Sequence, residues 1–227
     1  MILQIETATS SCSVALAKEG QVVAFKEIDS RNIHAEVITL FIRDLLDATG
    51  TMLQGLDAIA VSCGPGSYTG LRIGVSTAKG LCFALDKPLI AIETLEAMAF
   101  GVITYADIVA RYDMLCPMID ARRMEVYTAI FSNKGERLTP TSADIITNDS
   151  FRGLLSNNRI LFFGDGAAKC QDVLGVNPNA AFMPGFVNSA VHLTQKAWEK
   201  FLAQRFEDVA YFEPYYLKDF IAGKKAL

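Results

Sequence analysis

The order of the expected strands and helices in the first hundred residues constrains the fold more than any other feature of this sequence. Residues 2–6, 13–17 and 22–28 are rich in apolar and β-branched side chains and predict three short strands. Glu19-Gly20 lies between the last two strands and is typical of a hairpin turn. The chain is therefore expected to begin with an antiparallel meander of three strands.

Helices and strands alternate after the meander. We expect a helix at 34–48, a strand at 58–62, a helix at 69–85, a strand at 89–92 and a helix at 93–100. The resulting order, βββαβαβα, is typical of a mixed sheet with helices packed on its faces, as in the ribonuclease H-like and actin-like folds. The predicted fold class is therefore α/β.

A second and smaller α/β pattern follows residue 105. It consists of strands at 114–119 and 124–131 around a turn at 120–123, strands at 159–163 and 181–183, and a helix at 189–203. We therefore expect two actin-like lobes, the first at 1–104 and the second at 105–188. The C-terminal helix and tail at 189–227 can pack back on the first lobe.

Composition and charge limit the classes of function. The 227 residues are 51% hydrophobic and 20% charged, and no apolar run reaches the roughly 18 residues of a membrane span. A net charge of −4 argues against a protein that binds nucleic acid alone, because phosphate contacts need clustered lysines and arginines. The N-terminus lacks the features of a signal peptide and the five cysteines are scattered, so we expect a cytoplasmic protein without disulfides.

A glycine-rich stretch at 64–74, GPGSYTGLRIG, joins a predicted strand to a predicted helix. Such turns bind phosphate in many folds, because the first N–H groups of a helix have no partner within the helix. This stretch lacks the Lys-Ser/Thr ending of a P-loop, and Pro65 removes one amide. The turn at 6–11 carries serines and threonines, which more often close a turn on their own backbone. The sequence therefore gives nucleotide binding little support.

Candidate catalytic groups are scarce. His34 and His192 are the only histidines, and they lie in separate predicted lobes without a metal-ligand spacing. No Gly-x-Ser-x-Gly elbow or Ser/His/Asp order indicates a nucleophile, and Ser67 is more simply the cap of the helix that follows it. We therefore assign no catalytic, cofactor-binding or metal-binding residues.

The helices at 34–48 and 69–85 carry more apolar surface than one core face needs. At about 100° per residue, the apolar residues of the first helix cover well over half of its circumference. In the second helix, Gly70, Gly74 and Ala78 keep one side small enough for close helix contact. Two interpretations remain open, and both can hold at once: the helices pack on each other and on the sheet, or they present a face to a partner.

Several motifs stand out together. They are Ile5-Glu6-Thr7-Ala8-Thr9, the stretch 64–74 followed by Ala78-Lys79-Gly80, and Asp120-Ala121-Arg122-Arg123-Met124-Glu125-Val126-Tyr127. In this combination the sequence resembles the TsaB (YeaZ) family of the actin-like ATPase superfamily, and the long glycine motif is the most specific part of the match. The tail segment 213–217 is also similar to the closing segment of that family.

The resemblance implies a non-catalytic role in making threonylcarbamoyladenosine, the modified base beside the anticodon of tRNAs that read codons starting with A. In the family, TsaB supports the transferase TsaD in a complex joined by the ATPase TsaE, and tRNA binds through the complex. A homodimer is implied when TsaD is absent. No cofactor is expected on the chain alone, whereas ATP or ADP can bind at the interface of the assembled complex.

The resemblance also bears on metal binding and on the partner surface. TsaD carries a His-x-x-x-His metal site, and the matching positions here are Thr94 and Met98, which cannot replace two imidazoles. In the family the two proteins pair through the helices equivalent to 34–48 and 69–85. The residues expected at this interface are Val37, Ile38, Phe41, Leu45, Leu71, Gly74, Val75, Ala78 and Cys82. Phe41→Glu or Val75→Arg is then expected to leave the fold intact and to abolish binding to TsaD.

Two other functions remain alternatives. The first is a small-molecule kinase or ATPase of the actin-like superfamily, which would need an acidic cluster that holds a metal ion. The second is a glycoprotease-like metallopeptidase, which would need the missing histidines. Arg122 and Arg123, at a turn between strands, are weak candidates for contacts with tRNA.

Overall fold

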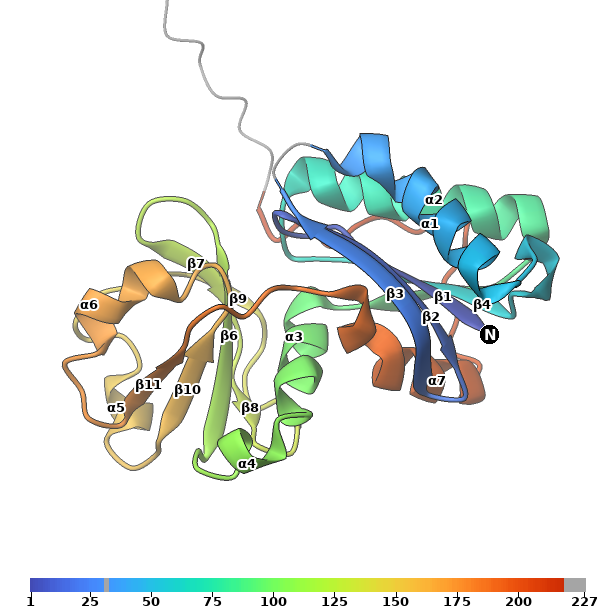
Figure 1. The fold of residues 1–227 in the computed structure, drawn as a ribbon. Helices are drawn as coiled ribbons and strands as arrows, with labels where there is room; N and C mark the ends of the chain where they lie inside the picture. Colours follow the sequence, from blue (N-terminus) through green and yellow to red (C-terminus); the bar gives the residue numbers. More distant parts are fainter. Residues whose placement is uncertain (31–32, 219–227) are drawn as a thin grey trace, which may run out of the picture.

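The computed structural model describes residues 1–30 and 33–218 and shows two lobes side by side, each built on its own β-sheet (Figure 1). The two sheets have helices packed against them, so the predicted α/β class is confirmed. No helix in the described part of the chain is long and apolar enough to cross a membrane. All five cysteines are free thiols, as expected.

The first lobe is built on a five-stranded mixed sheet with the order β3-β2-β1-β4-β5. Its strands are β1 (Ile2–Glu6), β2 (Ser11–Lys18), β3 (Gln21–Asp29), β4 (Ala58–Ser62) and β5 (Leu89–Ile92). The first three strands form the predicted antiparallel meander, and β1, β4 and β5 run parallel to one another. The predicted strands of this lobe are all confirmed, with shifts of one or two residues at their ends.

Both faces of the first sheet are covered by helices, which is why every residue of its central strands β1 and β4 is buried. On one face lie α1 (His34–Thr49) and α2 (Tyr68–Leu85). In the chain, the short 3₁₀ turn η1 (Leu53–Gly55) lies between α1 and β4, and α2 follows β4. On the other face lie η3 (Ala190–Leu193) and α7 (Thr194–Leu202). The predicted helix at 189–203 is therefore confirmed in place, but its first turn is a 3₁₀ helix.

The second lobe has a six-stranded sheet with the order β11-β10-β6-β7-β9, and β8 pairs with β6 outside this path. Its strands are β6 (Met114–Asp120), β7 (Glu125–Thr128), β8 (Phe131–Ser132), β9 (Ser142–Ile145), β10 (Ile160–Phe163) and β11 (Ala180–Met183). The sequence did not predict β9, which has only four residues, of which two are polar and one is alanine.

The prediction of a single strand at 124–131 was wrong. The chain forms β7 and β8 instead, which pair with opposite ends of β6. Between the two ladders lies Pro117 of β6, which has no N–H to donate. Its carbonyl accepts a hydrogen bond from the Thr128 hydroxyl (2.9 Å), a side-chain bond at the point where the ladder is interrupted.

The helix between the sheets is α3 (Thr94–Ile103), three residues longer at its C-terminal end than predicted. Leu95, Met98 and Val102 pack into the core of the second lobe, while Ala97 packs against the first sheet. The other helices of the second lobe are short: α4 (Ala106–Val109), α5 (Arg152–Leu155), η2 (Ala168–Cys170) and α6 (Gln171–Leu174).

The C-terminal tail returns to the first lobe after α7. The Tyr215 amide donates to the Cys63 carbonyl (2.7 Å), and Lys79 donates to the carbonyl of Phe212 (2.8 Å). Lys218 then forms an ion pair with Glu125 at the start of β7. The tail therefore contacts both lobes, while the expected boundaries at 104 and 188 stay a prediction. The last part of the expected tail, residues 219–227, lies outside the described residues.

Candidate functional site

The glycine-rich stretch places the start of α2 directly on the turn between β1 and β2. Ser67 caps the helix as predicted, since its hydroxyl accepts from the Gly70 amide at 3.3 Å. The Ser67 amide donates to the Ala8 carbonyl (2.7 Å), and the Thr7 hydroxyl donates to the Gly70 carbonyl (2.8 Å). The helix and the turn are thus joined by reciprocal hydrogen bonds.

Three glycines, four residues apart, make this contact sterically feasible. A Cβ atom on Gly66 would lie well within 3.0 Å of the Ala8 carbonyl, and one on Gly70 would do the same with the Thr7 carbonyl. A Cβ on Gly74 would overlap the Thr7 hydroxyl. Gly70 and Gly74 therefore allow a close approach, and the element that approaches them is the chain's own turn.

Most polar groups of the turn at 6–11 are bonded within the chain, whereas the buried Ser11 hydroxyl has no hydrogen-bond partner in the described structure. The Ala8 amide donates to the Glu6 carboxylate (2.6 Å), and the Ser11 amide donates to the Thr9 hydroxyl (3.3 Å). The His34 ring nitrogen Nε2 lies 3.0 Å from the Thr9 carbonyl, so the first residue of α1 also holds this turn. With helix α2 packed against it, the turn has the geometry of a structural corner rather than of an open phosphate cradle.

Glu6 itself is a buried carboxyl at the end of β1. Burial raises the pKa of Glu6 to about 7, although hydrogen bonds from the Ala8 amide and from Ser62 act in the opposite direction. A carboxyl in this environment holds its proton near neutral pH. Glu6 is not part of a metal-binding cluster. The described residues contain no group of three or more His, Cys, Asp or Glu side chains that could hold a metal ion.

Thr94 and Met98, which the resemblance relates to a metal site, serve the fold. The Thr94 hydroxyl lies 2.8 Å from the Ser62 hydroxyl and accepts from the Gly64 amide at 3.1 Å, so it joins α3 to the glycine-rich stretch. Met98 is buried in the core of the second lobe, and its methyl group leaves no room for a Cβ on Gly164. Neither side chain offers an imidazole nitrogen or a carboxylate to a metal.

The expected interface residues are mostly core residues of this chain. Ile38, Leu45, Leu71, Gly74, Val75, Ala78 and Cys82 are all buried, and most of them pack against β1, β2 and β4. Only Val37 and Phe41 are partly exposed, and Phe41 lies beneath Lys26 of β3, with Nζ 5.0 Å from the ring centroid. The apolar excess of the two helices is therefore largely explained by their packing on the sheet and on each other. Burial within the chain leaves little of these residues free to contact a partner, and their place at an interface with TsaD stays a prediction.

The two helices nevertheless leave an apolar groove on their outer side. The groove has a volume of about 470 Å³. Ile42 and Leu46 of α1 and Leu81 of α2 form its apolar lining, Met52 and Leu53 close one end, and Thr39, Arg43 and Asp47 lie along its α1 rim. Met52 is 73% exposed, which is unusual for so large an apolar side chain. Sequence reasoning missed this groove because Met52 lies after the helix, where no periodicity marks it.

Arg122 and Arg123 lie at the exposed tip of the β6–β7 hairpin, with positive φ angles of 72° and 50°. The Arg122 amide donates to the Asp120 carboxylate (2.9 Å), and the Asp120 amide donates to Asp165 (3.0 Å). Burial raises the pKa of Asp165, and Lys169 pairs with Asp120. The base of the hairpin is therefore held by hydrogen bonds and an ion pair, whereas Arg122 and Arg123 are exposed.

Comparison with known proteins identifies the family. The family model described as tRNA N6-adenosine threonylcarbamoyltransferase (TsaD) matches residues 27–222. The tRNA threonylcarbamoyladenosine biosynthesis protein TsaB of Escherichia coli (strain K12) is 32% identical over 232 residues, which cover 99% of this chain and 97% of that protein. The chain belongs to the TsaB family. The resemblance seen in the sequence motifs is thereby confirmed.

Solved structures agree with the TsaB assignment and with the fold. YeaZ from Pseudomonas aeruginosa superposes with a TM-score of 0.80 at 26% identity, over 95% of this chain and 99% of that chain. A polyphosphate/ATP-glucomannokinase from Arthrobacter sp. strain KM has a TM-score of 0.50 at 10% identity, over 89% of this chain and 98% of that chain, a likeness that shows the fold alone. The actin-like architecture expected from the order of elements is therefore confirmed.

A local similarity connects the chain with the transferase itself. The tRNA N6-adenosine threonylcarbamoyltransferase of Symbiobacterium thermophilum is 47% identical over 84 residues, which are 37% of this chain and 24% of that protein. Within this stretch of 84 residues the two chains are more alike than this chain and the TsaB of E. coli are over their full lengths.

Proposed function

We propose that this chain is a non-catalytic subunit of the machinery that makes threonylcarbamoyladenosine in tRNAs reading codons that start with A. The observation that carries the proposal is the packing of α2 onto the turn at 6–11, in which the Thr7 hydroxyl and the Glu6 carboxylate are bonded within the chain. Thr94 and Met98, at the positions of the metal ligands, support the same conclusion. The full-length similarity to TsaB of E. coli supplies the pathway.

The partner that we propose is the transferase TsaD, bound at the groove between α1 and α2. An apolar groove with a polar rim is the kind of surface that a helix of a partner covers. A transferase that is locally so similar to this chain can present a related pair of helices, and two related faces can pair around a pseudo-twofold axis. The same groove is our proposed site of homodimer formation when TsaD is absent.

The remaining parts of the assembly follow from the family. We propose that the ATPase TsaE joins the pair, that ATP or ADP binds at the interface of the assembled complex, and that tRNA is held by the complex rather than by this acidic chain alone. Arg122 and Arg123, at an exposed hairpin tip, are the proposed contribution of this chain to the phosphate contacts.

Reconstitution tests the proposed function. Purified TsaD, TsaE, tRNA, ATP and the threonylcarbamoyl donor are combined with and without this chain, and modified adenosine is measured by nucleoside mass spectrometry. We expect modification to require the chain and the chain alone to be inert. Modification at full rate without it would overturn the proposal. Magnesium-dependent hydrolysis of ATP by the chain alone would favour the kinase or ATPase alternative instead.

A further inference from the structure

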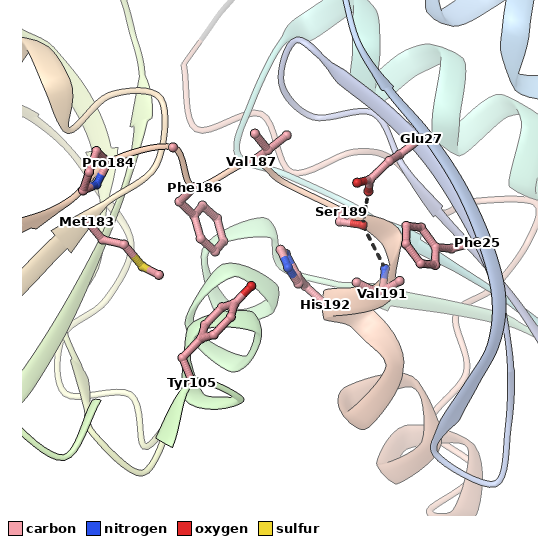
Figure 2. A pocket seen from close by; sticks show the side chains of 11 residues that line it. Phe25, Glu27, Tyr105, Met183, Pro184, Phe186, Val187, Ser189, Val191 and His192 are labelled. Carbon is pink, nitrogen blue, oxygen red and sulfur yellow. Dashed lines mark hydrogen bonds between the residues drawn. The ribbon is translucent and has the colours of Figure 1, made fainter. Parts of the chain in front are cut away.

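A cleft of about 400 Å³ opens between the lobes, on the side of the first sheet opposite to α1 and α2 (Figure 2). Phe25 and Glu27 of β3 form one wall, and the segment from Met183 to Val187 forms the other. Tyr105 and His192 close the floor between them. This cleft is separate from the groove between the helices, and its volume lies in the range of small-ligand sites.

Aromatic rings line both walls of the cleft. Phe186 is held in place by Phe163, with ring centroids 5.0 Å apart, and it stacks on His192 at 5.1 Å. Phe25 is 53% exposed and Tyr105 is 49% exposed, although both are large aromatic side chains. Phe25 and Tyr105 thus present much of their ring surface to the cleft, whereas Phe186 packs against the core of the second lobe and is partly exposed (Figure 2).

Glu27 gives the cleft its charge. Among the described residues that line it, Glu27 is the one acidic side chain. The Ser189 hydroxyl donates to one carboxylate oxygen of Glu27 at 2.6 Å, which fixes the orientation of the group. The other oxygen has no hydrogen bond of its own within the described structure. No lysine or arginine is among the lining residues that the structure describes, so an anionic ligand would find no counter-ion here.

His192 does not add a positive charge. Burial lowers the pKa of His192 to about 4, so the ring is neutral at physiological pH. Its position is fixed by α3, because a Cβ on Gly101 would overlap the imidazole ring. The floor of the cleft is therefore a rigid, neutral aromatic surface.

We propose that this cleft binds a small organic cation, an ammonium or guanidinium group that lies against Phe25, Tyr105 and Phe186 and pairs with Glu27. Aromatic faces attract cations through the quadrupole of the ring, and a carboxylate beside them adds an ion pair and a hydrogen bond. The cation can come from a free polyamine or from the arginine or lysine side chain of a protein. Since Phe25 and Phe186 belong to different lobes, the bound cation would contact both.

The two sources are tested in parallel with the full chain. Spermidine is the probe for a free polyamine, and acetyl-arginine amide is the probe for a protein side chain. Each is titrated by calorimetry and by NMR shift mapping, with glutarate as the anionic control. We expect saturable binding of at least one cation, shifts at Phe25, Tyr105 and Phe186, and no binding of glutarate. Absence of saturable binding by both cations would overturn the proposal.

Variants then locate the site. Glu27→Gln keeps an acceptor for Ser189 but removes the charge, and Phe25→Ala removes one ring. We expect each to weaken binding about threefold to tenfold. The matched controls are Glu136→Gln, an exposed carboxylate of the second lobe, and Tyr211→Ala, an exposed ring of the tail, which are expected to bind as the parent chain does. Equal losses in controls and cleft variants, with thermal unfolding unchanged, would place the cation elsewhere and refute the assignment.

Discussion

At the scale of single residues, glycine has two different roles in the same helix. Gly70 lies where the Thr7 carbonyl leaves no space for a side chain, whereas nothing lies within 4 Å of a Cβ on Gly80. The sequence shows both as glycines of α2 and cannot distinguish them, because the difference depends on a turn that is sixty residues away in the chain. This is the physical reason why the small side of α2 was assigned to a partner.

The pair Gly70→Ala and Gly80→Ala tests this difference. Gly70→Ala is expected to lower the free energy of unfolding by about 2 kcal/mol or more, since the overlap is with rigid backbone. Gly80→Ala is expected to raise it by about 0.5–1 kcal/mol, because alanine favours a helix over glycine. Urea denaturation followed by circular dichroism measures both. Equal effects of the two substitutions would contradict the packing of α2 on the turn.

Glu6 predicts a dependence of stability on pH. Its pKa is about 7 in the folded chain and near 4.5 in the unfolded chain, so the folded state holds the proton more tightly. Protonated Glu6 therefore stabilises the folded state relative to the unfolded chain. This contribution is fully present below pH 4.5 and is lost as the pH rises through 7. Its size is about 3 kcal/mol. Glu6→Gln is expected to flatten the dependence of the unfolding free energy on pH across this interval, relative to the parent chain. An unchanged slope in denaturation series at several pH values would exclude this role for Glu6.

At the scale of elements, the periodicity of α1 and α2 predicted the helices correctly but not their orientation. The helical wheel shows which residues share a side, but it cannot say whether that side meets a sheet of the same chain or a partner. Here Ile38 and Val75 meet the sheet, and the groove on the outer side is completed by Met52, which lies outside the helix. The element boundaries were predictable because caps and turns such as Ser67 and Gly50 are local features.

The corrected orientation changes the expected effect of Val75→Arg. Val75 is buried, so a charged side chain there is expected to unfold the chain rather than to abolish binding selectively. Met52→Glu is expected to keep the thermal unfolding midpoint and to weaken binding to TsaD about tenfold or more. Val176→Glu, an exposed apolar residue of the second lobe, is the control. Binding of the three variants to immobilised TsaD is then measured. Full-strength binding by a folded Met52→Glu variant would rule out the groove as the TsaD site.

At the scale of the whole molecule, the order of elements predicted the first lobe more completely than the second. The first lobe follows from strong local patterns, and its strands and helices agree with the structure. The second lobe contains β9, which is too short for its four residues to give a reliable strand pattern, and a proline that interrupts a ladder. The interlobe cleft was also not predictable, because Phe25 and Phe186 are brought together only by the packing of two lobes.

The C-terminal helix is expected to be part of the stability of the first lobe. Leu193 is fully buried against the first sheet, so Leu193→Ala is expected to cost about 2–4 kcal/mol of unfolding free energy. Leu202, at the exposed end of α7, is the matched control. Leu202→Ala is expected to change the unfolding free energy by less than about 0.5 kcal/mol. Thermal and urea denaturation measure both. Similar values for the two variants would mean that α7 is only loosely attached.

The position of η3 and α7 beneath the first sheet also sets the order in which the molecule is completed during synthesis. Ile2, Ala58 and Ile90 share their core with Ala190, Leu193 and Ala197. The second lobe is contiguous in the chain and can bury its own core as soon as it leaves the ribosome. The N-terminal sheet, although made earlier, keeps much of one apolar face uncovered until η3 and α7 have emerged. The lobe that begins the chain is therefore the lobe that finishes folding last.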